Sequence, residues 1–278
     1  YFYWDLKLMA QYAEMVQKPE DAKAFLALAE RLKTAFNKKF FNADEVIYAN
    51  GAATTCVLPL AFGLVPEEAK ERLFQRLVDK IMIENKGHPS TGLIGGQWLM
   101  RVLSDNGRPD VALTIATQED YPSWGYMISK NATTIWELWN GDTADPAMNS
   151  HNHVMLVGDL TTWLYQYLAG IRPDSPGAQK LVLKPCVVDG LDHVKASWRS
   201  PYGKVFSHWA RKDGKLTWKV TVPANATGTI YVPTTDPKSV TESGKPVGEV
   251  QGLTAAGTEG KAAIFTVGSG QYTFESTY

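Results

Sequence analysis

The chain has 278 residues, which is enough for two ordinary domains. Its 44% hydrophobic and 21% charged residues are close to globular averages and exclude a disordered chain or a coiled coil. Lys and Arg number 28 against 29 Asp and Glu, so the basic excess typical of nucleic-acid binders is absent. No apolar run reaches the roughly 18 residues that would cross a membrane. Cys56 and Cys186 lie too far apart for a disulfide scaffold or a four-ligand zinc site.

The first part of the chain is expected to be helical, because apolar residues recur there at a period of about 3.6. A proline followed by acidic residues begins two of the helices, at Pro19 and Pro66. Phe40–Tyr48 is expected to be a connecting loop or a hairpin. The expected helices are Asp5–Val16, Pro19–Lys39, Thr54–Phe62, Pro66–Met82, Leu93–Leu103, Pro109–Gln118 and Val154–Leu168.

After Arg172–Gly177 the sequence changes to short β-branched and aromatic runs separated by turn residues, which is typical of an antiparallel sandwich. Asp213-Gly214 between two alternating runs predicts a hairpin. We therefore expect a helical domain at 1–173 and a β-sandwich domain at 174–278. The expected strands are Leu181–Leu183, Val194–Trp198, Val205–Trp209, Leu216–Val222, Thr229–Val232 and Ala263–Val267.

The densest cluster of polar and aromatic residues runs from Tyr121 to His153. Glu137 lies between Trp136 and Trp139, with Asn140 and His153 nearby. This combination is typical of a glycoside hydrolase, in which aromatic rings stack on a sugar, Asn and His hold its hydroxyls, and a carboxylate moves a proton. From spacing alone, a helix-capping acid beneath two core tryptophans explains the pattern at least as well.

Three further motifs carry weaker hypotheses. His151-Asn-His153 could hold a metal only in an extended conformation, since helical residues two apart point in different directions, and no metal is expected. Gly92–Gly96 lacks the strand and the Lys-Ser/Thr of a phosphate loop, so we expect close backbone approach to a helix or a ligand. His88, just upstream, is a candidate for lining the same site.

One stretch of this sequence resembles a known family. Ala132–Asn140, preceded by Tyr-Pro-Ser-Trp124 and followed by Ser-His-Asn-His153, is similar to the late catalytic-domain signature of bacterial α-L-rhamnosidases, glycoside hydrolase family 78. Supporting landmarks in the same order are Leu60–Pro66, Gly87–Gly95, Leu168–Ile171 and Ser175–Pro185. The resemblance covers essentially the whole chain.

The resemblance implies an (α/α)6 barrel flanked by β-sandwich domains and an inverting enzyme with two glutamates, which needs no cofactor. It assigns the general base to Glu137. Candidates for contact with the sugar are Trp124, Trp136, Trp139, Asn140, His153 and His88. The sequence departs from the family pattern at two places. His151 stands where the family usually has an apolar or small polar residue, and Pro89-Ser90 stands where it has Leu-Thr or Leu-Ser.

The family's general acid belongs to a motif resembling Asp-x-Pro-x-Arg-x-Glu-Arg, which is absent here. The chain also begins at Tyr1 inside helical sequence without a signal peptide, and about seven helices cannot close a ring of twelve. We therefore expect the C-terminal portion of a rhamnosidase, a partial (α/α)6 barrel followed by a small antiparallel β-sandwich, inactive alone. Its uncovered first helices are expected to favour a homodimer.

The expected partner is a rhamnose-containing glycoside or polysaccharide, with no nucleic acid and no membrane. We expect the full-length protein to be periplasmic or extracellular, with a cytoplasmic location left open. Two alternatives remain: another (α/α)6 sugar hydrolase or lyase, such as a trehalase-like enzyme, and a non-catalytic carbohydrate-binding module in which Glu137 only accepts a hydroxyl hydrogen bond.

Overall fold

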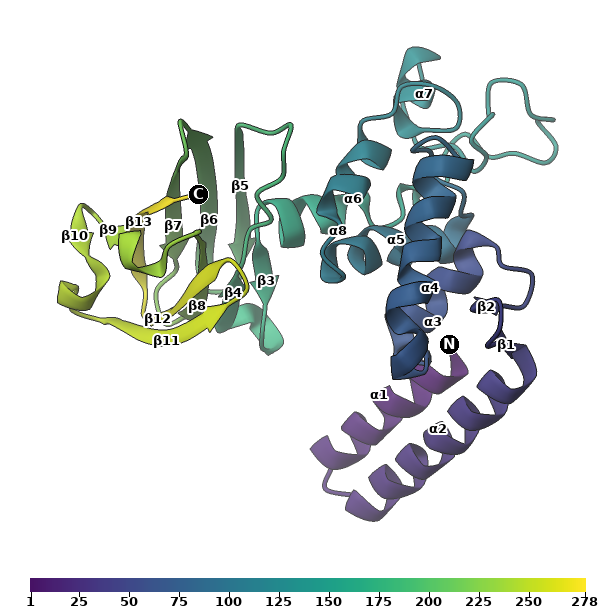
Figure 1. The fold of residues 1–278 in the computed structure, drawn as a ribbon, viewed down its shortest axis with the longest axis horizontal. Helices are drawn as coiled ribbons and strands as arrows, with labels where there is room; N and C mark the ends of the chain where they lie inside the picture. Colours follow the sequence, from purple (N-terminus) through teal and green to yellow (C-terminus); the bar gives the residue numbers. More distant parts are fainter. The chain divides into compact units, whose positions relative to one another are not determined.

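The computed structural model describes residues 1–278, which divide into two compact units, Tyr1–Asp159 and Leu160–Tyr278. The first unit is helical and runs from purple to teal in Figure 1. Its elements are α1 (Phe2–Met15), α2 (Pro19–Phe40), β1 (Phe41–Asn42), β2 (Ile47–Tyr48), α3 (Ala53–Phe62), α4 (Glu67–Asp79), a π-helical turn (Lys80–Glu84), α5 (Leu93–Asp105), α6 (Pro109–Ala116) and α7 (Trp124–Ser129). None of the chain's helices combines the length and the apolar character that crossing a bilayer requires.

Local sequence explains where these helices begin and end. α2 has Pro19 and two acidic residues in its first turn and Lys38 and Lys39 in its last turn, so charges of both signs complement the helix dipole. α3 stops at Gly63, which takes the left-handed conformation with φ +68° that glycine adopts at low cost. The expected hairpin at 40–48 is present as the short β1–β2 pair.

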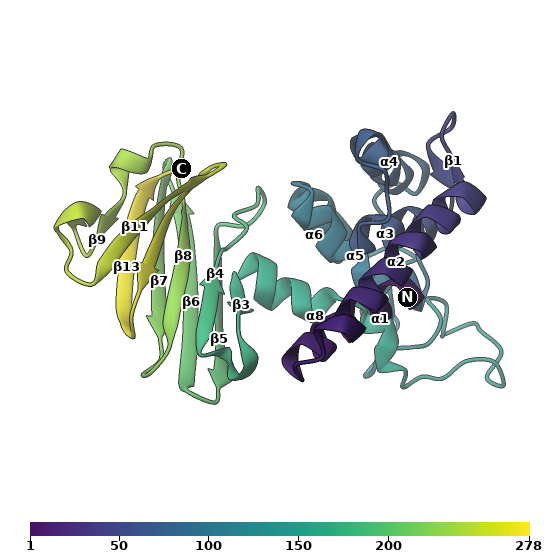
Figure 2. The same ribbon diagram turned by 90° about the horizontal axis from the view of Figure 1, so that it is seen from below.

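Helices α1 and α2 lie side by side in both views (Figures 1 and 2). Their shared core holds Leu6 and Ala29, and the Trp4 ring stacks on Phe62 of α3 at 5.6 Å between ring centroids. Apolar residues on the other side of α1 stay exposed at helical spacing. They are Phe2, Met9, Tyr12, Met15 and Val16.

The expected single helix Val154–Leu168 is wrong. Val154–Val157 forms a 3₁₀ turn, and a separate helix α8 (Leu160–Trp163) continues into a π-helical turn over Leu164–Leu168. The break lies at Gly158, whose φ of +55° and ψ of −127° are open to glycine and strained for any L side chain. Helical periodicity continued across this residue, so the sequence pattern concealed the break.

The second unit is two packed sheets. The strand order is β10-β9-β13-β7-β6-β5 in the six-stranded sheet and β11-β12-β8-β4-β3 in the five-stranded one. The strands are β3 (Ile171–Pro173), β4 (Lys180–Leu183), β5 (His193–Ser200), β6 (Gly203–Lys212), β7 (Lys215–Val222), β8 (Thr227–Pro233), β9 (Thr241–Glu242), β10 (Lys245–Pro246), β11 (Leu253–Glu259), β12 (Ala262–Val267) and β13 (Gly270–Thr277). The fold class, helices followed by a β-sandwich, is confirmed.

Two details of this unit bear on the sequence-based expectations. The hairpin at Asp213-Gly214 is confirmed, with positive φ at both residues joining β6 to β7. The expectation of purely antiparallel pairing is wrong at one place, because β4 pairs with β8 in parallel. A parallel pair needs a long crossover, and here the strands β5, β6 and β7 supply it.

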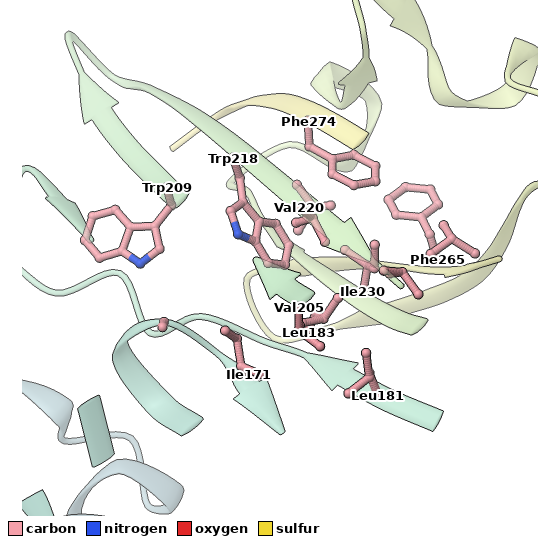
Figure 3. Close-up of a cluster of buried hydrophobic side chains, with 14 of the residues drawn as sticks. Ile171, Leu181, Leu183, Val205, Trp209, Trp218, Val220, Ile230, Phe265 and Phe274 are labelled. Carbon is pink, nitrogen blue, oxygen red and sulfur yellow. The ribbon is translucent and has the colours of Figure 1, made fainter. Parts of the chain in front are cut away.

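The core of this unit fills the space between the sheets (Figure 3). Trp209, Trp218 and Phe274 enter it from the six-stranded sheet, whereas Ile230 and Phe265 enter it from the five-stranded one. All five are almost completely buried, so they are among the side chains whose removal from water stabilises this unit.

Buried hydrogen bonds tie the start of this unit to the same core. The Trp209 indole donates to the Leu168 carbonyl at 2.7 Å, and the Ser207 hydroxyl donates to the Ala169 carbonyl at 2.6 Å. The expected domain boundary at 173/174 follows the change in sequence character, whereas the compact units divide between Asp159 and Leu160. These bonds explain the difference, because they attach residues 160–169 to the sheets.

We expect Ser207→Ala to destabilise the β unit by about 1–3 kcal/mol. The hydroxyl also accepts from the Trp218 indole N–H at 2.9 Å, so its loss leaves a buried donor and a buried carbonyl without partners. Hydrogen exchange of the β7 amides in the 278-residue chain measures this change. Ser197→Ala, on the exposed side of β5, is the control and should stay within about 0.5 kcal/mol. Equal effects from the two variants would contradict the assignment.

The exposed stripe on α1 supports the expected self-association, which remains a prediction. Met9 and Tyr12 are one helical turn apart, so they extend one apolar strip. We expect light scattering to give a mass above that of one 278-residue chain, falling to one chain in Met9→Lys/Tyr12→Lys. Ile83→Lys, at an exposed apolar residue outside α1, should leave the mass unchanged. A monomeric parent chain would contradict the prediction.

Candidate functional site

The segment that carries Glu137 pairs with the segment that carries His153. The Glu137 N–H donates to the Ser150 carbonyl at 2.8 Å, and the His153 N–H donates to the Ile135 carbonyl at 2.7 Å. Two residues separate these bonds along the first segment and three along the second. The two bonds hold the segments together and so fix the backbone at Glu137 and at His153.

The Glu137 carboxylate is held at one oxygen. Its Oε2 accepts a hydrogen bond from the Ser150 N–H at 3.0 Å, and within residues 1–278 its Oε1 has no hydrogen-bond partner. The residue is half-buried. A carboxylate that is oriented through one oxygen and open at the other can accept a proton from a molecule beside it. Sequence reasoning did not identify Ser150 as this donor, because a backbone N–H leaves no signature in side-chain identity.

Trp124 and Trp139 come together as predicted. Their rings meet edge to face with centroids 5.5 Å apart, and the Trp124 indole donates to the Leu156 carbonyl at 3.0 Å. Both rings line a small cavity of about 10 Å³, room for about one water, together with Gly96 and Gly158. Both side chains are partly exposed, so each retains ring surface for contact outside the protein.

Trp136 does not offer a ring face to a sugar in this structure. It is 6% exposed and packs in a cluster with Met127 and Leu156. Gly141 lies directly on its ring, since a Cβ there would come within 2.6 Å of the indole. The ring therefore supports the loop that follows Glu137 from below. This corrects the predicted sugar contact of Trp136, because packing against Met127 and Leu156 covers its ring.

The two histidines of the His-Asn-His motif are engaged differently. The His151 Nε2–H donates to the Gly141 carbonyl at 3.0 Å, which makes that nitrogen part of the loop. The His153 Nδ1 is buried and has no hydrogen-bond partner. An orphaned buried nitrogen in a native fold marks a place where a water or a ligand completes the hydrogen bonding. Across residues 1–278 no three His, Cys, Asp or Glu side chains group to hold a metal ion.

His88 and Asn140 lie at the edges of this region. The His88 Nδ1–H donates to the Pro122 carbonyl at 3.1 Å, which fixes the tautomer of the neutral ring and leaves its Nε2 as an acceptor. This bond ties the His88 loop to the residues before Trp124. The Asn140 amide donates to the Thr143 hydroxyl at 3.3 Å, inside its own turn. The Asn140 side chain therefore stabilises its own turn.

A tyrosine–aspartate pair beside the cluster was not predicted. The Tyr126 hydroxyl donates to the Asp142 carboxylate at 2.9 Å, and this hydrogen bond raises the pKa of Tyr126. The Lys130 ammonium lies 4.0 Å from the same carboxylate and 5.3 Å from the Tyr126 ring centroid. Only the folded loop brings these three residues together, since 16 positions separate the tyrosine from the aspartate.

Helix α5 supports the loop that carries His153. The Arg101 guanidinium binds the Asp159 carboxylate through two hydrogen bonds, and that side chain is only 2% exposed. A Cβ on Gly158 would lie 2.9 Å from the Gly96 carbonyl, so the two backbones are in direct contact. A Cβ on Gly95 would meet Thr54 of α3 at 2.4 Å. The expected close backbone approach at Gly92–Gly96 is confirmed, and its neighbours are a helix and a loop.

Comparison with known proteins identifies both units. The family model described as the bacterial α-L-rhamnosidase six-hairpin glycosidase domain matches residues 1–168. The model described as the bacterial α-L-rhamnosidase C-terminal domain matches residues 170–246. These matches include every candidate site residue.

Individual relatives agree with the family models. An α-L-rhamnosidase of Formosa agariphila is 33% identical over 283 residues, which cover 100% of this chain and 30% of the relative. The solved α-L-rhamnosidase of Dictyoglumus thermophilum superposes with a TM-score of 0.90 at 34% identity, covering 99% of this chain and 31% of that one. That of Streptomyces avermitilis, solved in complex with L-rhamnose, gives 0.88 at 31% identity, covering 97% and 26%. The chain thus spans about 30% of the length of its relatives.

We expect Gly158→Ala to destabilise the helical unit by about 1–3 kcal/mol through backbone strain, with a further cost from the contact at the Gly96 carbonyl. Hydrogen exchange of the α5 amides in the 278-residue chain measures the change. Gly92→Ala is the matched control, because Gly92 has extended backbone and nothing within 4 Å of its added Cβ. If Gly92→Ala destabilised the unit and Gly158→Ala did not, the structural role given to the Gly158 backbone would be wrong.

Proposed function

Because the chain belongs to the bacterial α-L-rhamnosidase family, we propose that the complete protein is a glycoside hydrolase that releases terminal α-L-rhamnose. The observation that carries the proposal is the Glu137 carboxylate, which lies within the matched catalytic segment, anchored at one oxygen and without a hydrogen-bond partner at the other. The relatives that are named α-L-rhamnosidases support the substrate class.

The proposed reaction inverts the anomeric centre in one step. Glu137 Oε1 removes a proton from a water as the water oxygen attacks the anomeric carbon, and a second carboxylic acid protonates the leaving oxygen. Inversion requires the two carboxyl groups to be about 6.5–9.5 Å apart, so that the water fits between one of them and the sugar. The Ser150 N–H keeps the base oriented during this transfer. No cofactor enters these steps.

Three side chains are proposed to hold the sugar. The orphaned Nδ1 of His153 is suited to a hydroxyl, because a ligand there would restore the missing hydrogen bond. The exposed parts of Trp124 and Trp139 supply flat apolar surface for the C–H face of the ring. Trp136, His88 and Asn140 act on the sugar only indirectly, through the loops that they support.

The general acid is proposed to come from sequence outside these 278 residues, because the acidic motif of the family is absent here. A missing acid or base lowers the rate by about 10²–10⁴-fold, so we propose that this chain alone turns over rhamnosides poorly or not at all. A carbohydrate-binding module remains the alternative, in which Glu137 accepts a hydroxyl hydrogen bond without moving a proton.

We expect Glu137→Gln in the complete protein to lower kcat for an aryl α-L-rhamnoside by about 10²–10⁴-fold, because an amide cannot accept the proton of the attacking water. Binding of L-rhamnose should change little, because the amide keeps the size of the side chain and can still accept the Ser150 hydrogen bond. Proton NMR during the first minutes of the wild-type reaction should show the β-anomer of L-rhamnose as the first product.

The matched control is Glu119→Gln, at an exposed acid close in sequence, which should leave kcat unchanged. Unchanged kcat in Glu137→Gln would reject the base assignment. An initial α-anomer would reject inversion, and absence of hydrolysis by the wild-type protein together with sugar binding would favour the binding module.

A further inference from the structure

The outward face of the six-stranded sheet is strongly basic. Alternate residues of β6 and β7 point into the core, as the buried Trp209 and Trp218 show, so the residues between them point outward. Here the basic face means the outward Lys and Arg of the adjacent strands β5, β6 and β7. Glu275 is the only outward acid on these three strands and the neighbouring β13. The cations are Lys195, Arg199, Lys204, Lys212, Lys215 and Lys219.

The strand register places these cations against one another. Lys195 lies opposite His208, which lies opposite Lys219, so three basic side chains form a row across β5, β6 and β7. Arg199 lies opposite Lys204 in the next row but one. Like charges directly opposite each other in a sheet are destabilising, so stability alone does not favour the Arg199–Lys204 pair.

Two acids lie at one end of the basic face, where Asp192 and Asp213 line a surface pocket together with Lys212 and Lys215. None of the six Lys and Arg residues of the basic face forms an ion pair within residues 1–278. The pKa of His208 is lowered, mainly because the ring is partly buried. The nearby Lys195, His193 and Lys219 lower this pKa further. The positive potential therefore persists at the surface and is available to an anionic partner.

An aromatic ring lies within the basic face. Phe206 is half-buried, and it points outward between the cations with its ring 5.6 Å from the Lys204 ammonium and 6.3 Å from the His208 ring. A flat aromatic surface among cations on a flat sheet suits a polymer that carries both apolar C–H faces and regularly spaced negative charges.

We propose that the basic face binds an acidic polysaccharide, a chain of sugars that carry carboxylate groups. The choice of a glycan rests on the proposed function, since a hydrolase of rhamnose-containing glycans gains from holding its polymer near the site. Nucleic acid is also a polyanion, so the test below includes duplex DNA as a competing ligand. A lipid surface is a weaker fit, because Phe206 is the only large apolar side chain at these outward positions.

The test measures binding of the 278-residue chain to polygalacturonate, with neutral dextran as the comparison polymer, at about 50 mM and about 300 mM salt. The proposal expects binding to polygalacturonate alone, weakened by salt because these charges are exposed. Lys195→Gln/Lys204→Gln/Lys219→Gln should weaken it about tenfold, which corresponds to three exposed charge contacts. The control Lys180→Gln/Lys238→Gln/Lys261→Gln removes the same charge from exposed lysines outside the face and should change it little.

Equal binding by the two triple variants would overturn the proposal. Binding to duplex DNA or to phosphatidylserine vesicles as tight as to polygalacturonate, at equal salt, would overturn it too. Hydrolysis of a neutral aryl rhamnoside by the complete protein tests the proposed function separately, and neither triple variant should alter it. Specific binding of polygalacturonate without hydrolysis of the aryl rhamnoside would therefore reject the proposed hydrolase activity. It would leave the proposed binding role of the basic face intact.

Discussion

The candidate site depends on the direct contact between the backbones of Gly158 and Gly96. This contact lets the loop after His153 lie against α5 with no side chain between them, and the Arg101–Asp159 pair holds it there. The loop then presents the Leu156 carbonyl to the Trp124 indole. A larger residue at Gly158 would push the loop outward and separate that carbonyl from its donor. The position of Trp124 thus depends on these two glycines, and the Trp139 ring meets the Trp124 ring edge to face.

Backbone groups do most of the positioning around Glu137. The Ser150 N–H orients its carboxylate, and the bond from the His153 N–H to the Ile135 carbonyl fixes the backbone at His153. Such an arrangement tolerates change in side chains, because any residue except proline supplies an N–H. It tolerates changes in loop length poorly, since one residue added or removed would change the register and rotate His153 away from its place.

The sequence predicted α1 to α6, six of the eleven strands of the second unit and the Asp213-Gly214 hairpin, because these depend on local periodicity and turn chemistry. It missed α7 and the strands β3, β9, β10, β11 and β13. It failed at Val154–Leu168, where one glycine interrupts a pattern that otherwise continues. It also failed at β11, whose Leu253–Glu259 is mostly exposed and has no apolar alternation to detect.

For the site, residue identity selected the segment around Glu137, but it could not separate the buried Trp136 from the exposed rings of Trp124 and Trp139. Burial depends on what packs above a residue, which its neighbours in sequence do not reveal. The basic face was not predicted from the sequence for a related reason. The overall charge balance averaged its lysines with acids that lie elsewhere on the chain.

The parallel pairing of β4 with β8 has a consequence for synthesis on the ribosome. β4 has two partners, β3 on one side and β8 on the other, and β8 is made only after the three strands of the β5–β7 meander. The meander can form from local hairpins while β4 still presents an unpaired edge. During that interval the emerging chain is exposed to wrong pairing at β4. A slowed ribosome between β4 and β8 would lengthen this interval, so codon usage there bears on the yield of soluble protein.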